Sequence, residues 1–137
     1  MTVVELTDTQ DRDQNTQCLT VLHVEDDETI SGIVKEILES EGWSVETCSD
    51  GAVALENILG NAHYDLLLVD QDLPSLNGVE LVRRTRRMDH RVLMPIIVLS
   101  AASVDADARE AGADLCLQKP LHISMLLESI ARVRGKQ

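Results

Sequence analysis

Four apolar runs in the sequence each end at a polar residue that could take part in chemistry. The runs cover residues 19–24, 66–69, 96–99 and 115–117. The polar residues at or just beyond their ends are Glu25, Asp26, Asp70, Ser100 and Lys119. If the runs are parallel strands, their carboxyl ends share one edge of a sheet, where open α/β sheets bind ligands. The sequence therefore predicts one crevice that gathers carboxylates, a hydroxyl and an ammonium group.

The carboxylates of Glu25, Asp26 and Asp70 would repel one another in such a crevice. Two carboxylates about 5 Å apart repel by about 3 kcal/mol at an effective dielectric constant of about 20. A hard divalent cation removes this cost, and Mg²⁺ is typically held by carboxylates, water and phosphate oxygens. A backbone carbonyl from the loop after Asp70 could complete the coordination. We therefore expect a Mg²⁺ site formed by these three residues.

Lys119 and Ser100 add groups that suit a phosphoryl oxygen. The lysine supplies a point charge, and the serine hydroxyl supplies a hydrogen bond. Each residue taken alone has an ordinary explanation, since acidic helix starts, turn-forming aspartates, exposed lysines and capping serines are all common. Their joint occurrence at the ends of strands favours a site for a cation and a phosphoryl group.

Strand-like and helix-like segments alternate from residue 19 onward. The expected strands are residues 20–24, 43–48, 66–69, 94–99 and 115–117. The helix after the first strand carries an apolar stripe formed by Ile30, Ile33, Val34, Ile37 and Leu38. Alternation of this kind predicts a parallel sheet covered by helices on both faces, with the first and third strands central. We expect one domain over residues 18–135, preceded by a mobile tail at residues 1–17 that lacks apolar periodicity.

Composition narrows the class of function. The 137 residues include 12 basic and 24 acidic residues, for a net charge of -12, which argues against direct binding of nucleic acid. No apolar run approaches the roughly 20 residues that a membrane span needs, so we expect no membrane insertion. The three cysteines show no CxxC spacing, which favours reduced thiols and a cytoplasmic location.

The motifs, in order, resemble the receiver domain of two-component response regulators. They are Val24-Glu25-Asp26-Asp27, Leu68-Val69-Asp70 with Pro74 and Gly78, Leu99-Ser100-Ala101, and Lys119-Pro120. The resemblance implies a flavodoxin-like, doubly wound α/β fold with five parallel strands in the order 2-1-3-4-5 and five helices. It also implies a phosphoprotein of signal transduction, a switch that catalyses its own phosphorylation and dephosphorylation and is not otherwise an enzyme.

The resemblance assigns a role to each residue of the acidic group. Asp70 would accept a phosphoryl group, in a Mg²⁺-dependent reaction, from a sensor histidine kinase or a phosphotransfer protein. Asp26 would bind Mg²⁺ directly and Glu25 would bind it through water. Asp70 itself and the backbone carbonyl of Asp72 would supply the remaining protein ligands.

The resemblance also implies how the phosphorylated state is read. Lys119 would pair with Asp70 at rest and with the phosphoryl group afterwards, and its bond to Pro120 would be cis. Ser100 would move toward the phosphoryl group and carry the next loop with it, which alters binding to a downstream protein target.

Three features depart from the family pattern. Cys116 stands where an aromatic residue is usual, and we interpret it as a small packing residue rather than a redox sensor. The segment after Ser100 is short by about one helical turn, so we expect the next helix to be short or displaced. The side chain of Asp72 could either position a hydrolytic water or repel it.

Two other functions stay open at this point. One is a receiver-like binding module that is never phosphorylated, which the intact set of site residues disfavours. The other is a phosphatase of the haloacid dehalogenase type, because Asp70-Gln71-Asp72 resembles its Asp-x-Asp signature. That family places the signature after its first strand and usually has a longer chain with a cap, which disfavours it here.

Overall fold

The structure, a computed structural model, describes residues 18–135, so the tail expected at residues 1–17 lies outside the described residues. The strands are β1 (Thr20–Val24), β2 (Ser44–Cys48), β3 (Leu66–Asp70), β4 (Ile96–Ser100) and β5 (Leu115–Gln118). The helices are α2 (Glu28–Ser40), α3 (Gly51–Leu59), α4 (Gly78–Thr85), α5 (Asp105–Ala111) and α6 (Ile123–Gly135), with a short 3₁₀ turn η1 (Asp89–Arg91).

The strands form one parallel sheet in the order β2-β1-β3-β4-β5. This confirms the predicted strand order and the five helices around it. The central strands are β1, β3 and β4, so the first and third strands lie inside the sheet as expected. The register pairs Asp70 with Leu99 and Ser100 with Gln118, which brings the carboxyl ends of β3, β4 and β5 level with one another.

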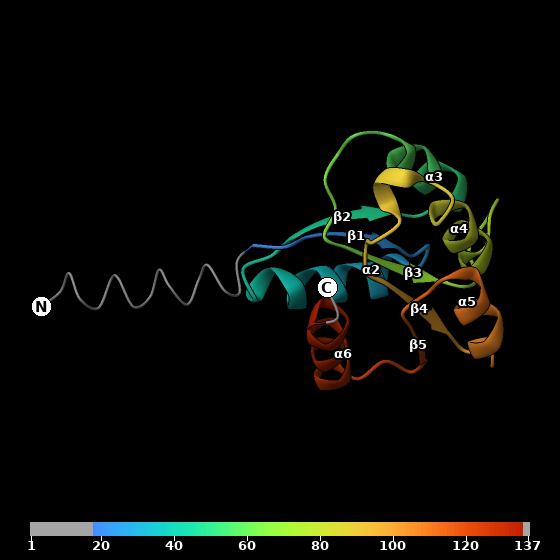
Figure 1. The fold of residues 1–137 in the computed structure, drawn as a ribbon. Helices are drawn as coiled ribbons and strands as arrows, with labels where there is room; N and C mark the ends of the chain where they lie inside the picture. Colours follow the sequence, from blue (N-terminus) through green and yellow to red (C-terminus); the bar gives the residue numbers. More distant parts are fainter. Residues whose placement is uncertain (1–17, 136–137) are drawn as a thin grey trace, which may run out of the picture.

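Helices cover both faces of the sheet (Figure 1). On one face α3, α4 and α5 pack against Leu67 and Val69, and on the other α2 and α6 pack against Leu66 and Leu68. All four of these leucine and valine side chains are fully buried. Burial of such a side chain contributes about 1.5–3 kcal/mol. The consecutive apolar residues of β3 therefore reflect burial on both faces, the pattern of a parallel sheet.

Local chemistry fixes the ends of several elements. Asp27 caps α2, because its Oδ1 accepts hydrogen bonds from the backbone N–H groups of Thr29 and Ile30. Two predicted strand starts were wrong: β2 begins one residue later than expected, and β4 begins at Ile96 rather than at residue 94. Strands β3, β4 and β5 each end one residue later than expected. Pro95 precedes Ile96 and has no N–H to contribute to a ladder.

Helix α5 is short, as expected. It has seven residues, from Asp105 to Ala111. It ends at Gly112, whose φ of 117° belongs to the left-handed region and closes the helix.

Candidate functional site

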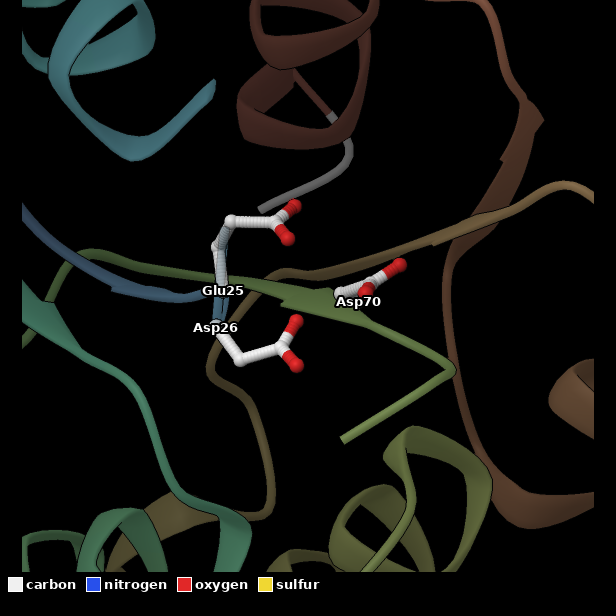
Figure 2. Close-up of side chains that lie close together, drawn as sticks. All are labelled: Glu25, Asp26 and Asp70. Atoms are coloured by element: carbon white, nitrogen blue, oxygen red, sulfur yellow. The ribbon is translucent and has the colours of Figure 1, made fainter. Parts of the chain in front are cut away.

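Three carboxylates meet at the carboxyl edge of the sheet. Glu25 and Asp26 directly follow β1, and Asp70 is the last residue of the neighbouring strand β3. Each offers a carboxylate oxygen, and these three oxygens lie within 4.8 Å of one another. Figure 2 shows the three side chains converging from the two strand ends. Glu25 and Asp70 are buried, whereas Asp26 is exposed.

Lys119 reaches the two buried carboxylates from beyond the end of β5. Its Nζ lies 2.9 Å from Oδ1 of Asp70 and 3.3 Å from Oε1 of Glu25. The other oxygen of Glu25, Oε2, accepts a hydrogen bond of 3.1 Å from the N–H of Asp27. The bond between Lys119 and Pro120 is cis, as expected. The ammonium group therefore partly neutralises the buried pair.

The pKa shifts show how burial and neighbouring charges act on the residues of the cluster. Burial raises the pKa of Asp70, the hydrogen bond from Lys119 partly offsets this rise, and the charges of Asp72 and Asp26 add to it. Burial likewise raises the pKa of Glu25. Burial acts to lower the pKa of Lys119, but its bonds and charge interactions with Asp70 and Glu25 outweigh burial and raise that pKa. One lysine thus leaves excess negative charge in the site.

The residues fit a hard divalent cation. Two carboxylates whose oxygens lie within 4.8 Å of each other repel by about 3 kcal/mol or more at an effective dielectric constant of about 20. Oxygen-only ligands from two strand ends, with an exposed Asp26 on the open side, match the way proteins hold Mg²⁺ with a few carboxylates and several waters. The chemistry of the donor set therefore suits Mg²⁺ better than a metal that prefers nitrogen or sulfur.

Ser100 lies at the end of β4, between the strands that carry Asp70 and lead to Lys119. Its side chain is buried, and its hydroxyl donates to the carbonyl of Ala102 at 2.8 Å. The same hydroxyl oxygen accepts from the N–H of Ala102 at 3.1 Å. The hydroxyl is thus engaged within its own loop.

Asp72 lies in the loop after Asp70, and its side chain is exposed. Its charge reaches Asp70, where it contributes to the raised pKa. The sequence-predicted site residues therefore lie at one edge of the sheet, and Asp72 lies on its open side.

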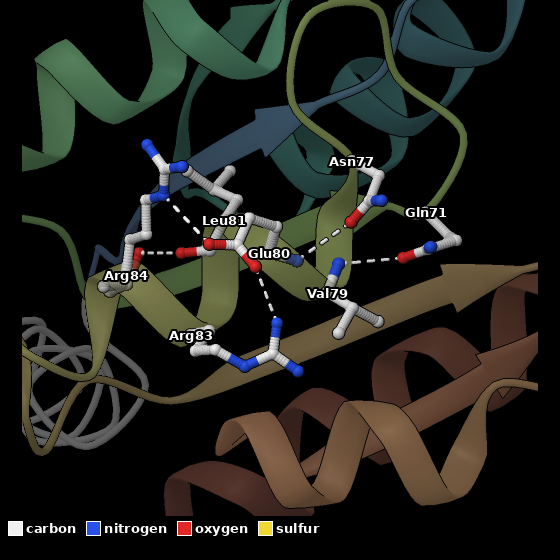
Figure 3. Close-up of polar contacts among 8 residues, drawn as sticks. Gln71, Asn77, Val79, Glu80, Leu81, Arg83 and Arg84 are labelled. Carbon is white, nitrogen blue, oxygen red and sulfur yellow. Dashed lines mark hydrogen bonds and ion pairs between the residues drawn. The ribbon is translucent and has the colours of Figure 1, made fainter.

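Gln71 was not singled out from the sequence, yet it fixes the start of this loop. Its N–H donates to Leu99 at 2.8 Å, its backbone carbonyl accepts from Gly78 at 3.0 Å, and its Oε1 accepts from the N–H of Val79 at 2.8 Å. Figure 3 shows the side-chain contact beside Asn77, which caps α4. The only signal in the sequence was an amide side chain next to an acidic one, which is too common to predict this contact.

Cys116 faces the helix α5 side of the sheet and packs against the core cluster there. Burial raises the pKa of its thiol to about 11, and the hydrogen bond and charge of Asp105 act in the same direction. A protonated, partly buried thiol packs as a small apolar group, and this is the interpretation that the sequence favoured.

Comparison with known proteins identifies the same family that the sequence motifs resemble. The family model of the response regulator receiver domain matches residues 21–131. The chain is 36% identical over 118 residues to a transcriptional regulatory protein, a CpxR homolog of Haemophilus influenzae. It is 35% identical over 120 residues to the response regulator ArlR of Staphylococcus saprophyticus. These matches cover 84% and 85% of the chain but only 48% and 53% of the relatives, so the chain spans about half of their length.

Solved structures agree with this fold. A CheY-like response regulator receiver domain protein of Methanospirillum hungatei has a TM-score of 0.80 and 32% identity, over 88% of this chain and 96% of that one. The receiver domain of the sensor histidine kinase PA1611 of Pseudomonas aeruginosa has a TM-score of 0.79 and 28% identity. That match covers 86% of this chain and 98% of that one, whose active-site cleft holds a coordinated magnesium ion. Within residues 18–135, no helix is long and apolar enough to cross a membrane.

Proposed function

The chain belongs to the response regulator receiver domain family, and on that basis we propose that Asp70 is its phosphoryl acceptor. The observation that carries the proposal is the convergence of Asp70 with Glu25, Asp26 and Lys119 at one edge of the sheet. The donor would be a phosphohistidine on a sensor histidine kinase or a phosphotransfer protein. The three cysteines are free thiols, which supports a reducing compartment such as the cytoplasm.

The reaction follows from the charges of the site. An Oδ atom of Asp70 attacks phosphorus, a new O–P bond forms, and the P–N bond to the donor imidazole breaks in line with it. The imidazole keeps the electron pair of the broken bond and takes up a proton. Lys119, which already contacts Asp70, stabilises the negative charge on the equatorial phosphoryl oxygens.

Glu25, Asp26 and Asp70, with the backbone carbonyl of Asp72, would hold Mg²⁺. When bound, Mg²⁺ neutralises charge on the carboxylates and on the phosphoryl oxygens. The protein contributes the fixed positions of these ligands, since Glu25 is held by the N–H of Asp27 and by Lys119. This arrangement supports Mg²⁺-dependent phosphorylation.

Ser100 would report the phosphorylated state. Its hydroxyl is held by Ala102 in the structure, and release of that bond frees it to donate to a phosphoryl oxygen. The loop that contains Ala102 would then follow the hydroxyl. Phosphorylation replaces the carboxylate charge of Asp70, about −1, with a phosphoryl group of about −2, and the added charge and new oxygens beside this loop can bias a two-state equilibrium between loop conformations. A downstream protein target that binds one loop conformation better would read the signal.

Intact mass measurement tests the proposal. The protein is incubated with acetyl phosphate and Mg²⁺, and we expect an adduct of about 80 Da, the mass of one phosphoryl group. The adduct should be absent in Asp70→Asn and in wild type with EDTA. The matched control is Asp89→Asn, because Asp89 is an exposed aspartate in η1, away from the site.

Two results would contradict the proposal. Consumption of acetyl phosphate without an adduct would favour a phosphatase. An absence of any reaction, in a protein that is folded by circular dichroism, would favour a binding module that is never phosphorylated.

A further inference from the structure

The loop between Asp70 and α4, residues 71–77, contains a strained residue. Ser75 has a φ of 71° and is the one non-glycine residue with positive φ among residues 18–135. Residues other than glycine, asparagine and aspartate seldom adopt this conformation. A serine is held there only when surrounding contacts determine it, and such strain is concentrated at functional sites.

The contacts that hold Ser75 come from the turn between β2 and α3. Its Oγ donates to Oδ2 of Asp50 at 2.9 Å. The N–H of Gly51 donates to the carbonyl of Pro74 at 3.2 Å. Gly51 also lies against the carbonyl oxygen of Leu76, which would be only 1.9 Å from a Cβ atom at position 51. We name these contacts of Asp50 and Gly51 with residues 74–76 the loop clamp.

The two carboxylate oxygens of Asp50 make different contacts. Oδ1 caps α3 by accepting from the N–H groups of Ala52 and Val53, at 2.7 Å and 3.1 Å. Oδ2 accepts from Ser75 alone among the contacts of the described residues. The N–H of Val53 and the hydroxyl of Ser75 lower the pKa of Asp50, so its carboxylate is ionised and its hydrogen bonds are charge-assisted. The contact to Ser75 is therefore separable from the helix cap.

The opposite end of the loop is fixed independently. Gln71 is bonded to Leu99, Gly78 and Val79, as described above. Gly78 packs on the backbone of the acceptor, since a Cβ atom there would lie 2.5 Å from the carbonyl oxygen of Asp70. Asp72 thus lies between an anchor at Gln71 and the loop clamp at residues 74–76.

We propose that Asp50, acting through Ser75, is a positioning residue that holds the loop in the conformation in which Asp72 can serve the metal site. The inference rests on the proposed function, because it assigns the loop clamp to the Mg²⁺ site described there. A loop that is ordered in advance loses less entropy when its carbonyl binds a cation. The loop clamp therefore sets the affinity for Mg²⁺ and has little influence on the rate of phosphorylation once Mg²⁺ is saturating.

Calorimetric titration of Mg²⁺ into the unphosphorylated protein tests this directly. Ser75→Ala removes the hydroxyl and should raise the Kd for Mg²⁺ about two- to ten-fold, the range that loss of one hydrogen bond allows. The rate of phosphorylation by acetyl phosphate at saturating Mg²⁺ should stay within about two-fold of wild type on the same argument. Amide hydrogen exchange in residues 71–77 of the metal-free protein should become faster.

Variants of Asp50 separate the loop clamp from the helix cap. Asp50→Ser keeps a good cap, but its single oxygen is occupied by α3, so the Kd should rise as in Ser75→Ala. Asp50→Asn keeps the cap and places an amide where Oδ2 was, and its N–H can donate to Ser75, so the Kd should stay close to wild type. The double variant Asp50→Ser with Ser75→Ala should bind Mg²⁺ with the same Kd as either single variant, because each substitution removes the same interaction.

Ser40→Ala is the matched control, since it removes an exposed serine hydroxyl that donates to Ile37 at the end of α2. It should leave the Kd unchanged. A Kd for Ser75→Ala and Asp50→Ser equal to that of wild type would overturn the loop clamp while leaving the proposed function intact. Failure of the wild type to bind Mg²⁺ and to form the adduct would instead overturn the proposed function and the inference with it.

Discussion

The Nζ atom of Lys119 lies 2.9 Å from Oδ1 of Asp70, although the strands that lead to these residues are separated in the sheet by β4. The same Nζ is 3.3 Å from Glu25 beyond β1. Since Asp70 and Glu25 are buried and Lys119 is mostly so, this contact is the principal compensation for two carboxylates at the sheet edge. The charge balance of the site therefore depends on both Lys119 and Asp70.

Lys119→Met should slow phosphorylation of Asp70 strongly. The substitution keeps the length of the side chain but removes the charge that stabilises the transferring phosphoryl group. Loss of one such group typically lowers a rate by about 100- to 1,000-fold. The rate of appearance of the adduct with acetyl phosphate, followed by intact mass, measures the effect. Lys35→Met, an exposed lysine on α2, should react at the wild-type rate. Equal rates for Lys119→Met and Lys35→Met would contradict the role given to Lys119.

Asp70→Asn should stabilise the metal-free protein at neutral pH. The pKa of Asp70 is raised in the folded protein, so above its ordinary pKa the unfolded chain releases this proton more readily than the folded one. Stability contributed by the protonated group is therefore lost as the pH rises through that window, and an uncharged amide avoids the loss. We expect a rise in melting temperature of roughly 2–8 °C, as for about 1 kcal/mol.

Thermal melts at pH 7 with EDTA and with Mg²⁺ measure this difference. Mg²⁺ should shrink it, because the cation binds the folded wild type preferentially. Asp89→Asn, which changes an exposed aspartate, should melt like wild type under both conditions. A lower melting temperature for Asp70→Asn than for wild type in EDTA would show that the attraction of Lys119 outweighs burial.

Gly78→Ala should disrupt the site by displacing the acceptor backbone. The new Cβ atom would lie 2.5 Å from the carbonyl oxygen of Asp70 and 2.9 Å from Cα of Gln71, and neither backbone atom can move freely. We expect a loss of roughly 1–3 kcal/mol of unfolding free energy, the usual cost of overpacking, together with slower phosphorylation. Urea unfolding measures the first effect and adduct formation the second.

Gly32→Ala is the control for Gly78→Ala, because a Cβ atom at position 32 would meet nothing within 4 Å apart from its chain neighbours and the backbone of its own helix. Gly32 lies inside α2, where alanine is favoured over glycine by roughly 0.5–1 kcal/mol. This variant should therefore be more stable than wild type. Similar stabilities for the two alanine variants would contradict the packing described for Gly78.

Cys116 should react slowly with iodoacetamide in the folded protein at pH 8. Its pKa is raised to about 11 by burial and by Asp105, so little thiolate is present at that pH. The exposed Cys18 should be alkylated first, as peptide mass mapping will show. The thiol of Cys116 stays protonated to a higher pH in the folded protein than in the unfolded chain. Its contribution to stability therefore falls as the pH rises from 9 toward 11, and Cys116→Ala should not show that fall. Alkylation of Cys116 as fast as that of Cys18 would contradict the shift.

The sequence by itself determined much of the fold. The consecutive apolar residues of β3 and β4 are fully buried on both faces. The stripe that begins at Ile30 became the packed face of α2 except at Ile33, whose side chain is exposed. Asp27, which directly precedes α2, caps that helix. These features could be predicted because hydrophobic periodicity and capping act within a few residues of the chain, where neighbours along the sequence are also neighbours in space.

The candidate site was predictable in part for a related reason. In a parallel sheet every strand ends at the same edge, so Glu25, Asp26, Asp70 and Ser100 had to lie along one edge once the strands were found. The strand order was inferred from the resemblance of these motifs to a family, since apolar patterns state which residues are buried and not which strands are adjacent.

Only the tertiary structure decided the contacts that join separate loops. The pairing of Lys119 with both Glu25 and Asp70, and the bond between Asp50 and Ser75, depend on the relative placement of segments far apart in the sequence. The strained φ of Ser75 could not be predicted from composition or periodicity, because the surrounding packing imposes it. Short-range patterns encode burial and helix ends, whereas directional contacts between loops arise only when the whole chain is packed.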